Sequence, residues 1–400
     1  MYITGGNLMS VRKIKDDIYA VGVVDWDRRL FDELIPLPDG TSYNAYLIEG
    51  SEATALIDTV EEDFSEKLIN NLKELNIDKI DYIISNHSEP DHSGSLGEVI
   101  DEFPEAKILA TEKAESMLND LLEIPQDKIQ VVEGKETLSL GNKTLEFIDT
   151  PWVHWPETMS TYLKEDEILF SCDFLGSHLA TSDLYVEDKP EVYEAAKRYY
   201  AEIMMPFRKI IKSNLKKLEE YDFDLIAPSH GPIYDEPEFI LNAYKDWVSD
   251  EVKPEVVVPY ISMHGSTEEM VDYFVDQLME KDIKVKPFNM TNTDLGDLAI
   301  SLVDAAVVVM GSPTVLTGPH PDMAYVAILA NALRPKTKYA SIIGSYGWAG
   351  NMVDDIVDMI PKLNVELFDP VVAKGKPSAE DYQELDRMIA EIEEKFNKMN

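Results

Sequence analysis

The chain has 400 residues, of which 44% are apolar, and it carries a formal net charge of −40 at pH 7. The length allows two or three domains with sizeable cores, and the apolar content excludes a mostly disordered chain. The acidic excess argues against binding to nucleic acid or to anionic membrane surfaces, since both need clustered Lys and Arg.

The sequence also limits the covalent and membrane chemistry of the chain. Cys172 is the single cysteine, so neither a disulfide within the chain nor a four-cysteine iron site can form. No apolar run reaches the ~18 residues that a membrane span needs. The N-terminal segment, MYITGGNLMSVRKIKDD, lacks the apolar stretch of a signal peptide, and we therefore expect a cytoplasmic protein.

Short apolar segments alternate with turns through the first half of the chain. Strands are expected at 44–50, 53–60, 81–85, 107–111, 144–150 and 167–173, with a strand that runs into a loop at 224–231. Helical spacing of apolar residues predicts a helix over 62–75, and a second helix is expected over roughly 190–220.

A polar stretch that contains a proline, DWVSDEVKPE at 246–255, separates this half from a different pattern. The segment VVVPYIS at 256–262 is almost continuously apolar, which is typical of a strand buried in a parallel sheet. Further strands are expected at 305–312 and 338–345, and helices at 266–280, 321–333, 350–361 and 378–399. This alternation predicts a doubly wound α/β sheet, so we divide the chain into domains of residues 1–253 and 254–400.

One loop of the first domain, SNHSEPDHSGSL at 85–96, concentrates potential metal ligands. It places His87, Glu89, Asp91 and His92 within six positions of a chain that has seven histidines. Side chains two apart point the same way in an extended loop, so His87, Glu89 and Asp91 can converge. Side chains of this kind repel one another or bind a cation.

Three more ligand-type residues stand where predicted strands end, which is where α/β layers place their chemistry. They are His154, Asp173 and His230. Any one histidine alone would more often be structural, but the joint pattern favours a site. The set suffices for two metals if Asp173 bridges them. The first metal would take His87, Glu89, His154 and Asp173, and the second would take Asp91, His92, His230 and Asp173.

The order HxxxDH, then His, Asp and His, resembles the metallo-β-lactamase fold, an αββα sandwich with a binuclear site. That superfamily usually has a histidine where this chain has Glu89, and it binds zinc. A carboxylate at this position favours iron over zinc. The pattern H-x-E-x-D-H is similar to that of the flavodiiron proteins. We expect Glu89, Asp173 and His178 to be catalytic, with His178 beside the ligands, five residues after Asp173.

The second domain begins with a strand that runs into SMHGST, residues 262–267, and then into a helix. Hydroxyl groups, a glycine and the amides of a helix N-terminus form a phosphate cradle. The loop lacks the lysine and the spacing of a nucleotide triphosphate loop, and it resembles the loop that holds the FMN phosphate in flavodoxins. The residues expected to bind the phosphate are Ser262, Met263, His264, Gly265, Ser266 and Thr267.

Two further loops, GSPTVLTGPHP at 311–321 and GSYGWAG at 344–350, follow predicted strands. In flavodoxin-like domains the corresponding loops hold the isoalloxazine ring, although glycine-rich loops are also ordinary strand-to-helix turns. The resemblance therefore implies that the ring is bound by Pro313, Thr314, Val315, Ser345, Tyr346, Gly347 and Trp348.

The flavodiiron resemblance covers nearly the entire chain and implies FMN and two iron ions as cofactors. It implies reduction of dioxygen to water, with electrons passing through FMN, in a head-to-tail homodimer or a dimer of dimers. The segment from Ser10 to Ile48 looks most like members of methanogenic archaea that oxidise reduced coenzyme F420, and we expect this donor.

Other readings of the sequence stay open. A rubredoxin-dependent oxygen or nitric oxide reductase of the same family is the first alternative. A binuclear zinc hydrolase and a non-enzymatic electron carrier are less favoured, because Glu89 argues against zinc and the full ligand set argues against a degenerate scaffold.

Overall fold

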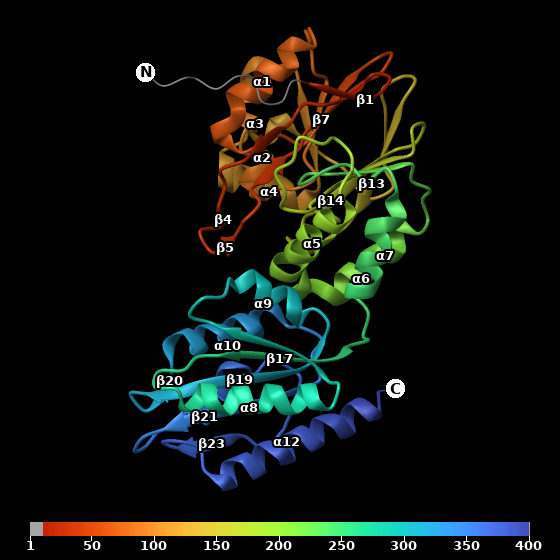
Figure 1. Ribbon diagram of the computed structural model, residues 1–400. Coiled ribbons are helices and arrows are strands. Elements are labelled where there is room, and N and C mark those ends of the chain that lie inside the picture. Colours follow the sequence, from red (N-terminus) through yellow and green to blue (C-terminus); the bar gives the residue numbers. More distant parts are fainter. Residues whose placement is uncertain (1–10, 400) are drawn as a thin grey trace. The chain divides into compact units, whose positions relative to one another are not determined.

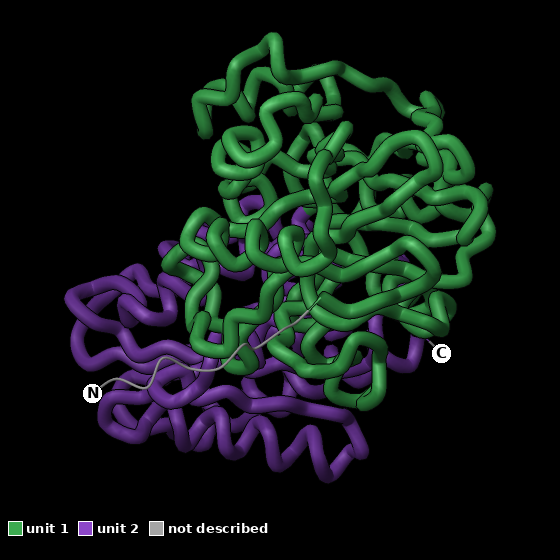
Figure 2. The backbone as a smooth tube through the Cα atoms, turned by 90° about the horizontal axis from the view of Figure 1, so that it is seen from above, with its two compact units in different colours: residues 1–200, 207–248 green, residues 201–206, 249–400 purple. Residues whose placement is uncertain are grey.

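The computed structural model describes residues 11–399 and divides into two compact units (Figures 1 and 2). One unit contains the described residues up to Tyr200 together with Phe207–Val248. The other contains Ala201–Pro206 and the described residues from Ser249 onward.

The first unit is built on two sheets. The larger sheet has seven strands in the spatial order β1 (Arg12–Lys15), β2 (Ile18–Ala20), β7 (Tyr46–Glu49), β8 (Thr54–Ile57), β9 (Tyr82–Ile84), β10 (Lys107–Ala110) and β11 (Ile129–Val131). The smaller sheet has the order β12 (Thr137–Ser139), β13 (Thr144–Asp149), β14 (Met159–Leu163), β15 (Ile168–Cys172) and β16 (Leu225–Pro228). Two short hairpin-like pairs join β3 (Val23–Asp25) to β6 (Thr41–Tyr43) and β4 (Leu30–Phe31) to β5 (Ile35–Pro36).

Successive apolar side chains along the strands of the larger sheet point to opposite faces, so both faces of this sheet are covered. Ile57 and Ile84 point toward the smaller sheet and pack with its Phe147, whereas Leu56 and Ile83 point to the opposite face. That opposite face packs against α1 (Ser65–Glu74), α3 (Leu96–Glu102) and α4 (Glu112–Leu122). Beside the smaller sheet, helix α6 (Arg208–Leu218) bonds to the last residue of β13 and to the loop after it. Asn214 donates to the Pro151 carbonyl and Lys217 donates to the Asp149 carbonyl. The expected αββα sandwich is confirmed.

The helix expected over roughly 190–220 is interrupted. It comprises α5 (Lys189–Tyr199), a π-helical turn (Tyr200–Met204), a 3-10 turn (Met205–Phe207) and α6 (Arg208–Leu218). Pro206 explains the break, because proline has no amide hydrogen to donate and its ring clashes with the preceding turn. The last helix of this unit is α7 (Pro237–Trp247).

The second unit is a parallel sheet with helices on both faces. Its strands have the spatial order β18 (Lys284–Asn289), β17 (Lys253–Tyr260), β19 (Ala305–Val315) and β21 (Tyr339–Tyr346), followed by β22 (Glu366–Leu367) and β23 (Val371–Lys374), which both pair with β21. This is the flavodoxin-like strand order, so the expected doubly wound sheet is confirmed. Strand β18 and helix α9 (Leu295–Leu302) were not predicted from the sequence.

Consecutive residues of the central strands are buried on opposite faces, as the continuous apolar pattern indicates. On one face Val256 and Val258 pack with α8 (Ser266–Glu280) and α12 (Ala379–Asn397). On the other face Val257 and Val308 pack with α9, α10 (Pro321–Leu333) and α11 (Met352–Met359). Within the described part of the chain, no helix is both long enough and apolar enough to cross a membrane.

We expect Phe274→Ala to destabilise the second unit by about 3–5 kcal/mol, because Phe274 is fully buried on the inner face of α8 and its removal leaves a cavity. Denaturant unfolding followed by circular dichroism measures the change. Met279→Ala is the matched control, since Met279 lies on the same helix and is 61% exposed. Equal midpoints for the two variants would contradict the expectation.

Candidate metal centre and flavin loops

The seven predicted metal ligands lie on loops that leave the carboxyl ends of four strands. The loop after β9 carries His87, Glu89, Asp91 and His92, and the last two lie on the short helix α2 (Pro90–Ser93). The other three, His154, Asp173 and His230, follow β13, β15 and β16. β13 and β15 are both antiparallel to β14, and β16 is parallel to β15, so these three loops emerge at one edge of the smaller sheet.

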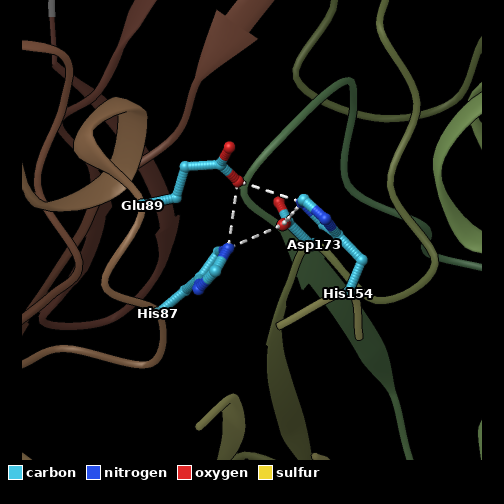
Figure 3. A group of neighbouring side chains, drawn as sticks. All are labelled: His87, Glu89, His154 and Asp173. Carbon is cyan, nitrogen blue, oxygen red and sulfur yellow. Dashed lines mark hydrogen bonds and ion pairs between the residues drawn. The ribbon is translucent and has the colours of Figure 1, made fainter. Parts of the chain in front are cut away.

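A first group consists of His87, Glu89, His154 and Asp173, whose ligand atoms all lie within 4.8 Å of one another. The Glu89 carboxylate is 3.1 Å from His87 Nε2 and 2.9 Å from His154 Nε2. Oδ2 of Asp173 lies 3.4 Å and 3.5 Å from the same two nitrogen atoms. The four side chains therefore point toward one common centre (Figure 3).

A second group consists of Asp91, His92 and His230. Asp91 lies 3.3 Å from the Nε2 atoms of both histidines. The other carboxylate oxygen of Asp173, Oδ1, is 2.8 Å from His92 Nε2 and 3.4 Å from His230 Nε2. Asp173 thus presents one oxygen to each group, which is the arrangement that a bridging ligand requires.

The electrostatics of the two groups fit bound cations. Both oxygens of Asp91, both ring nitrogens of His92 and Oδ1 of Asp173 are buried and have no hydrogen-bond partner among the described residues. Burial would raise the pKa of Asp173, but the neighbouring His92 and His230 outweigh it and hold that pKa well below its usual range. Burial likewise opposes a charge on His230, but the carboxylates of Asp173 and Asp91 that face its Nε2 raise its pKa to about 10.

Buried carboxylates and imidazoles of this kind need compensation by paired charge or metal ions. The donor set of the two groups mixes imidazole nitrogen with carboxylate oxygen, and the buried thiol of Cys172 also lies close to His92 and Asp173. Such a set suits iron in carboxylate-bridged pairs. The residues present therefore fit two iron ions, and their assignment as ligands remains a prediction.

His178 lies beside the ligands and belongs to neither group. Its ring is 4.7 Å from that of His230, and its Nδ1 is 2.9 Å from Thr41 Oγ1. Burial, reinforced by His230, lowers the pKa of His178 well below its usual value, so the ring is neutral at pH 7. Its buried Nε2 has no hydrogen-bond partner among the described residues.

Sequence reasoning missed Glu157. Its Oε1 accepts hydrogen bonds from His87 Nδ1 at 2.7 Å and from the Ser88 amide at 3.0 Å. Burial would raise the pKa of Glu157, but the hydrogen bond with His87 outweighs it and lowers that pKa. The available signal was a carboxylate three residues after His154, in HWPE.

The predicted phosphate loop has the local geometry of an anion cradle. Gly265 adopts a left-handed conformation, with φ of 87°, directly before α8. Ser262 Oγ accepts hydrogen bonds from the amides of Gly265 and Glu268. The buried Thr267 hydroxyl lies 2.9 Å from Ser345 Oγ and so ties this loop to the third loop. Two of the remaining predicted residues, Met263 and His264, lie on the same turn, and the third, Ser266, is the first residue of α8. Met263 is 49% exposed.

The other two predicted loops follow strands that neighbour β17 in the sheet. Pro313, Thr314 and Val315 belong to the end of β19, which is longer than expected because it folds back onto β20 (Gly318–Pro319). The turn between them has positive φ at Leu316 and Thr317, as a type I′ hairpin requires.

Ser345 and Tyr346 end β21, and Gly347 and Trp348 follow that strand. Thr314 and Tyr346 also line a cavity of about 370 Å³. A Cβ atom placed on Gly265 or on Gly347 would meet no atom within 4 Å. The loops therefore leave open space where a flavin could bind, next to the point where the strand order reverses. The individual contacts remain predictions.

Comparison with known proteins agrees with both units. The chain matches the family described as ODP family beta lactamase over residues 41–231 and the family described as Flavodoxin over residues 258–387. It is 35% identical to a nitric oxide reductase of Moorella thermoacetica, over 94% of this chain and 97% of that protein. It is 32% identical to the coenzyme F420H(2) oxidase of Methanothermobacter marburgensis, over 90% and 92% of the two chains.

A solved structure, that of rubredoxin oxygen:oxidoreductase from Desulfovibrio gigas, superposes with a TM-score of 0.94 at 29% identity. The superposition covers 98% of this chain and 99% of that chain.

Proposed function

Because this chain belongs to the family of flavodiiron proteins, we propose that it reduces dioxygen to water with electrons from reduced coenzyme F420. The observation that carries this proposal is the pair of buried ligand groups that share Asp173. The electrons would enter at FMN in the flavodoxin domain and leave at two irons in the lactamase-like domain. We place these domains at residues 254–400 and 1–253.

The side chains of this protein would hold the cofactors and exclude competing reactions. Bound iron and FMN supply stepwise transfer of the four electrons that, with four protons, convert one dioxygen into two water molecules. Asp173 holds the two metal positions together, and Glu89 adds a carboxylate to the first. His178 is neutral and buried beside His230, so it can donate or accept one hydrogen bond to a small molecule at that side of the site.

Reduced coenzyme F420 is the proposed donor, and the named oxidase of Methanothermobacter marburgensis supports this choice. The chain itself has one cysteine, so it does not contain the four thiolates of a rubredoxin iron site. A cytoplasmic location remains a prediction of the sequence.

The test of the donor is an anaerobic mixture of purified protein and reduced coenzyme F420, followed by admission of oxygen. Coenzyme absorbance and oxygen uptake are recorded together with hydrogen peroxide. We expect rapid oxidation of the coenzyme with two coenzyme molecules consumed per dioxygen, since each gives two electrons, and no peroxide. Absence of coenzyme oxidation by protein that contains FMN and iron would reject this donor.

The second candidate is a rubredoxin-dependent reductase of oxygen or nitric oxide. The similarity to a nitric oxide reductase and to rubredoxin oxygen:oxidoreductase favours it specifically. Turnover that requires an added rubredoxin and its reductase would establish this alternative, and parallel assays with oxygen and nitric oxide would identify the acceptor.

We further propose a head-to-tail homodimer, or a dimer of such dimers, in which FMN of one subunit serves the metals of the other. Mixed dimers of Asp173→Asn and Gly265→Val subunits should then regain activity, because one FMN site and one metal site remain intact across the interface. Subunits with different affinity tags allow purification of the mixed dimer. The two homodimers are the controls, and an inactive mixed dimer would show that each chain uses its own two sites.

A further inference from the structure

We propose that Glu157 is a positioning residue that orients His87 and makes the two iron positions electrostatically unequal. This inference rests on the ligand set of the proposed function. It adds a residue outside that set and assigns the residue a separate effect on the redox behaviour of the centre.

The hydrogen bond of Glu157 determines which ring nitrogen of His87 faces the metal position. Oε1 of Glu157 is 2.7 Å from Nδ1 of His87, and both side chains are completely buried. A proton held on Nδ1 leaves the lone pair of Nε2 free to bind a metal. Nε2 is the atom that faces Glu89 and Asp173.

The backbone around Glu157 is anchored, so the carboxylate is held in place. Thr111 Oγ1 donates a hydrogen bond to the Glu157 carbonyl, and Thr158 bonds to the Thr150 carbonyl on the same loop. Trp155, also on this loop, packs edge-on against the His87 ring with centroids 5.1 Å apart. One loop therefore supplies the ligand His154, the carboxylate that orients His87 and the ring that packs against it.

In the second metal position, His230 is oriented by uncharged groups. Nδ1 of His230 donates to the backbone carbonyl of Ser42 at 2.6 Å and lies 3.3 Å from the hydroxyl of Thr41. Its orienting groups are therefore neutral, whereas His87 is oriented by a carboxylate.

The charge of Glu157 acts in a buried environment. Its second oxygen, Oε2, is buried and has no hydrogen-bond partner among the described residues, whereas Oε1 accepts a hydrogen bond from the Ser88 amide as well as from His87. A buried carboxylate behind a ligand imidazole raises the basicity of that ligand, and low local dielectric strengthens the effect. The iron held by His87 and His154 should therefore retain the ferric state longer than its neighbour during reduction.

The test compares wild type with Glu157→Gln, which keeps a hydrogen-bond acceptor of the same shape and removes the charge. Glu112→Gln is the matched control, since Glu112 is exposed and lines the same cavity as Glu157. Anaerobic reductive titration followed by electron paramagnetic resonance measures the yield of the mixed-valent pair. Transfer of iron to a chelator, FMN content and the melting temperature of metal-free protein are measured in parallel.

We expect Glu157→Gln to release iron about 10–100-fold faster and to give a lower mixed-valent yield, with FMN content unchanged. Glu112→Gln should behave as wild type. Unchanged iron release and unchanged mixed-valent yield in Glu157→Gln would overturn the inference while leaving the ligand set intact. Wild-type protein that binds no iron would reject the ligand set and this inference together.

A second variant separates charge from a purely structural role. Glu157→Asp keeps the charge and shortens the side chain, so it should retain more of the mixed-valent yield than Glu157→Gln does. An Asp variant that is folded, by its melting temperature, and yet has lost the mixed-valent state would show that the charge is not the cause. If Glu157→Gln fails to fold, Glu157→Asp is compared with wild type, and the same loss of the mixed-valent state in folded protein would overturn the inference.

Discussion

Asp173→Asn should remove most of the bound iron and abolish oxygen reduction while FMN stays bound. Asp173 is 1% exposed and offers one carboxylate oxygen to each metal group, at 3.4 Å from His87 and 2.8 Å from His92. Asparagine keeps the shape of the side chain but replaces one of those oxygens by an NH2 group, which cannot bind a cation. The loss of turnover should exceed the roughly 10- to 100-fold effects that are typical of residues outside the ligand shell.

Metal analysis and flavin absorbance on the same preparation measure both parts of this expectation. Asp127→Asn is the control, because Asp127 is an exposed aspartate of the same domain, far along the chain from the seven ligands. If Asp173→Asn protein contained as much iron as wild type, the bridging role assigned to Asp173 would be wrong. If FMN were lost as well, the substitution would have disturbed the fold and not only the metal site.

Gly265→Val should release FMN on dialysis and leave the iron in place. Gly265 has φ of 87° directly before α8, a conformation that costs an L-residue roughly 1–2 kcal/mol and is worse for a β-branched one. A Cβ would meet no atom within 4 Å, so the expected damage comes from backbone strain and not from a clash. Relief of this strain would change the turn and point the amides at the N-terminus of α8 away from the expected position of the phosphate.

Absorbance of the dialysed protein and fluorescence of the dialysate follow the flavin, and metal analysis follows the iron. Gly97→Ala is the matched control for added side-chain volume, since Gly97 lies in α3, has no positive φ and also has open space around it. A Gly265→Val protein that keeps its yellow colour after dialysis would exclude the loop 262–267 as the phosphate site.

Local pattern was sufficient for the architecture of the second unit, whereas the αββα architecture of the first unit was predicted from a resemblance in its ligand motif. The continuous apolar run at 256–262 and the alternation of strands and helices after it predicted the buried parallel sheet, because each residue of such a strand meets an apolar layer. In the first unit, a strand followed by a ligand-bearing loop recurred at His87, His154, Asp173 and His230. Ligand-type residues that recur at strand ends favoured a shared site, although β9 belongs to the larger sheet and the other three strands belong to the smaller one.

Local pattern was not sufficient where one residue or a distant contact decides the result. Pro206 replaced one long predicted helix by α5, a π-helical turn and α6. The end of β19 was predicted as a loop, yet it continues as a strand because it pairs with Gly318 and Pro319 across a tight turn. Strand β18 was missed because lysines interrupt its apolar residues, and its position is stabilised by pairing with β17.

The sequence by itself therefore predicted the doubly wound sheet and the residues that are suited to bind metal, because these follow from periodicity and from side-chain chemistry. The αββα fold and the cofactors FMN and iron were predicted from the resemblance to the flavodiiron proteins. The division of the ligands into two groups was also predicted from the sequence, but only the tertiary structure placed one oxygen of Asp173 toward His87 and the other toward His92. Only the tertiary structure also brings Glu157 within hydrogen-bond distance of His87, which lies 70 positions earlier in the chain. The physical reason is that hydrogen bonds and charge interactions act over a few ångströms, and only the packing of the two sheets brings these loops within that range.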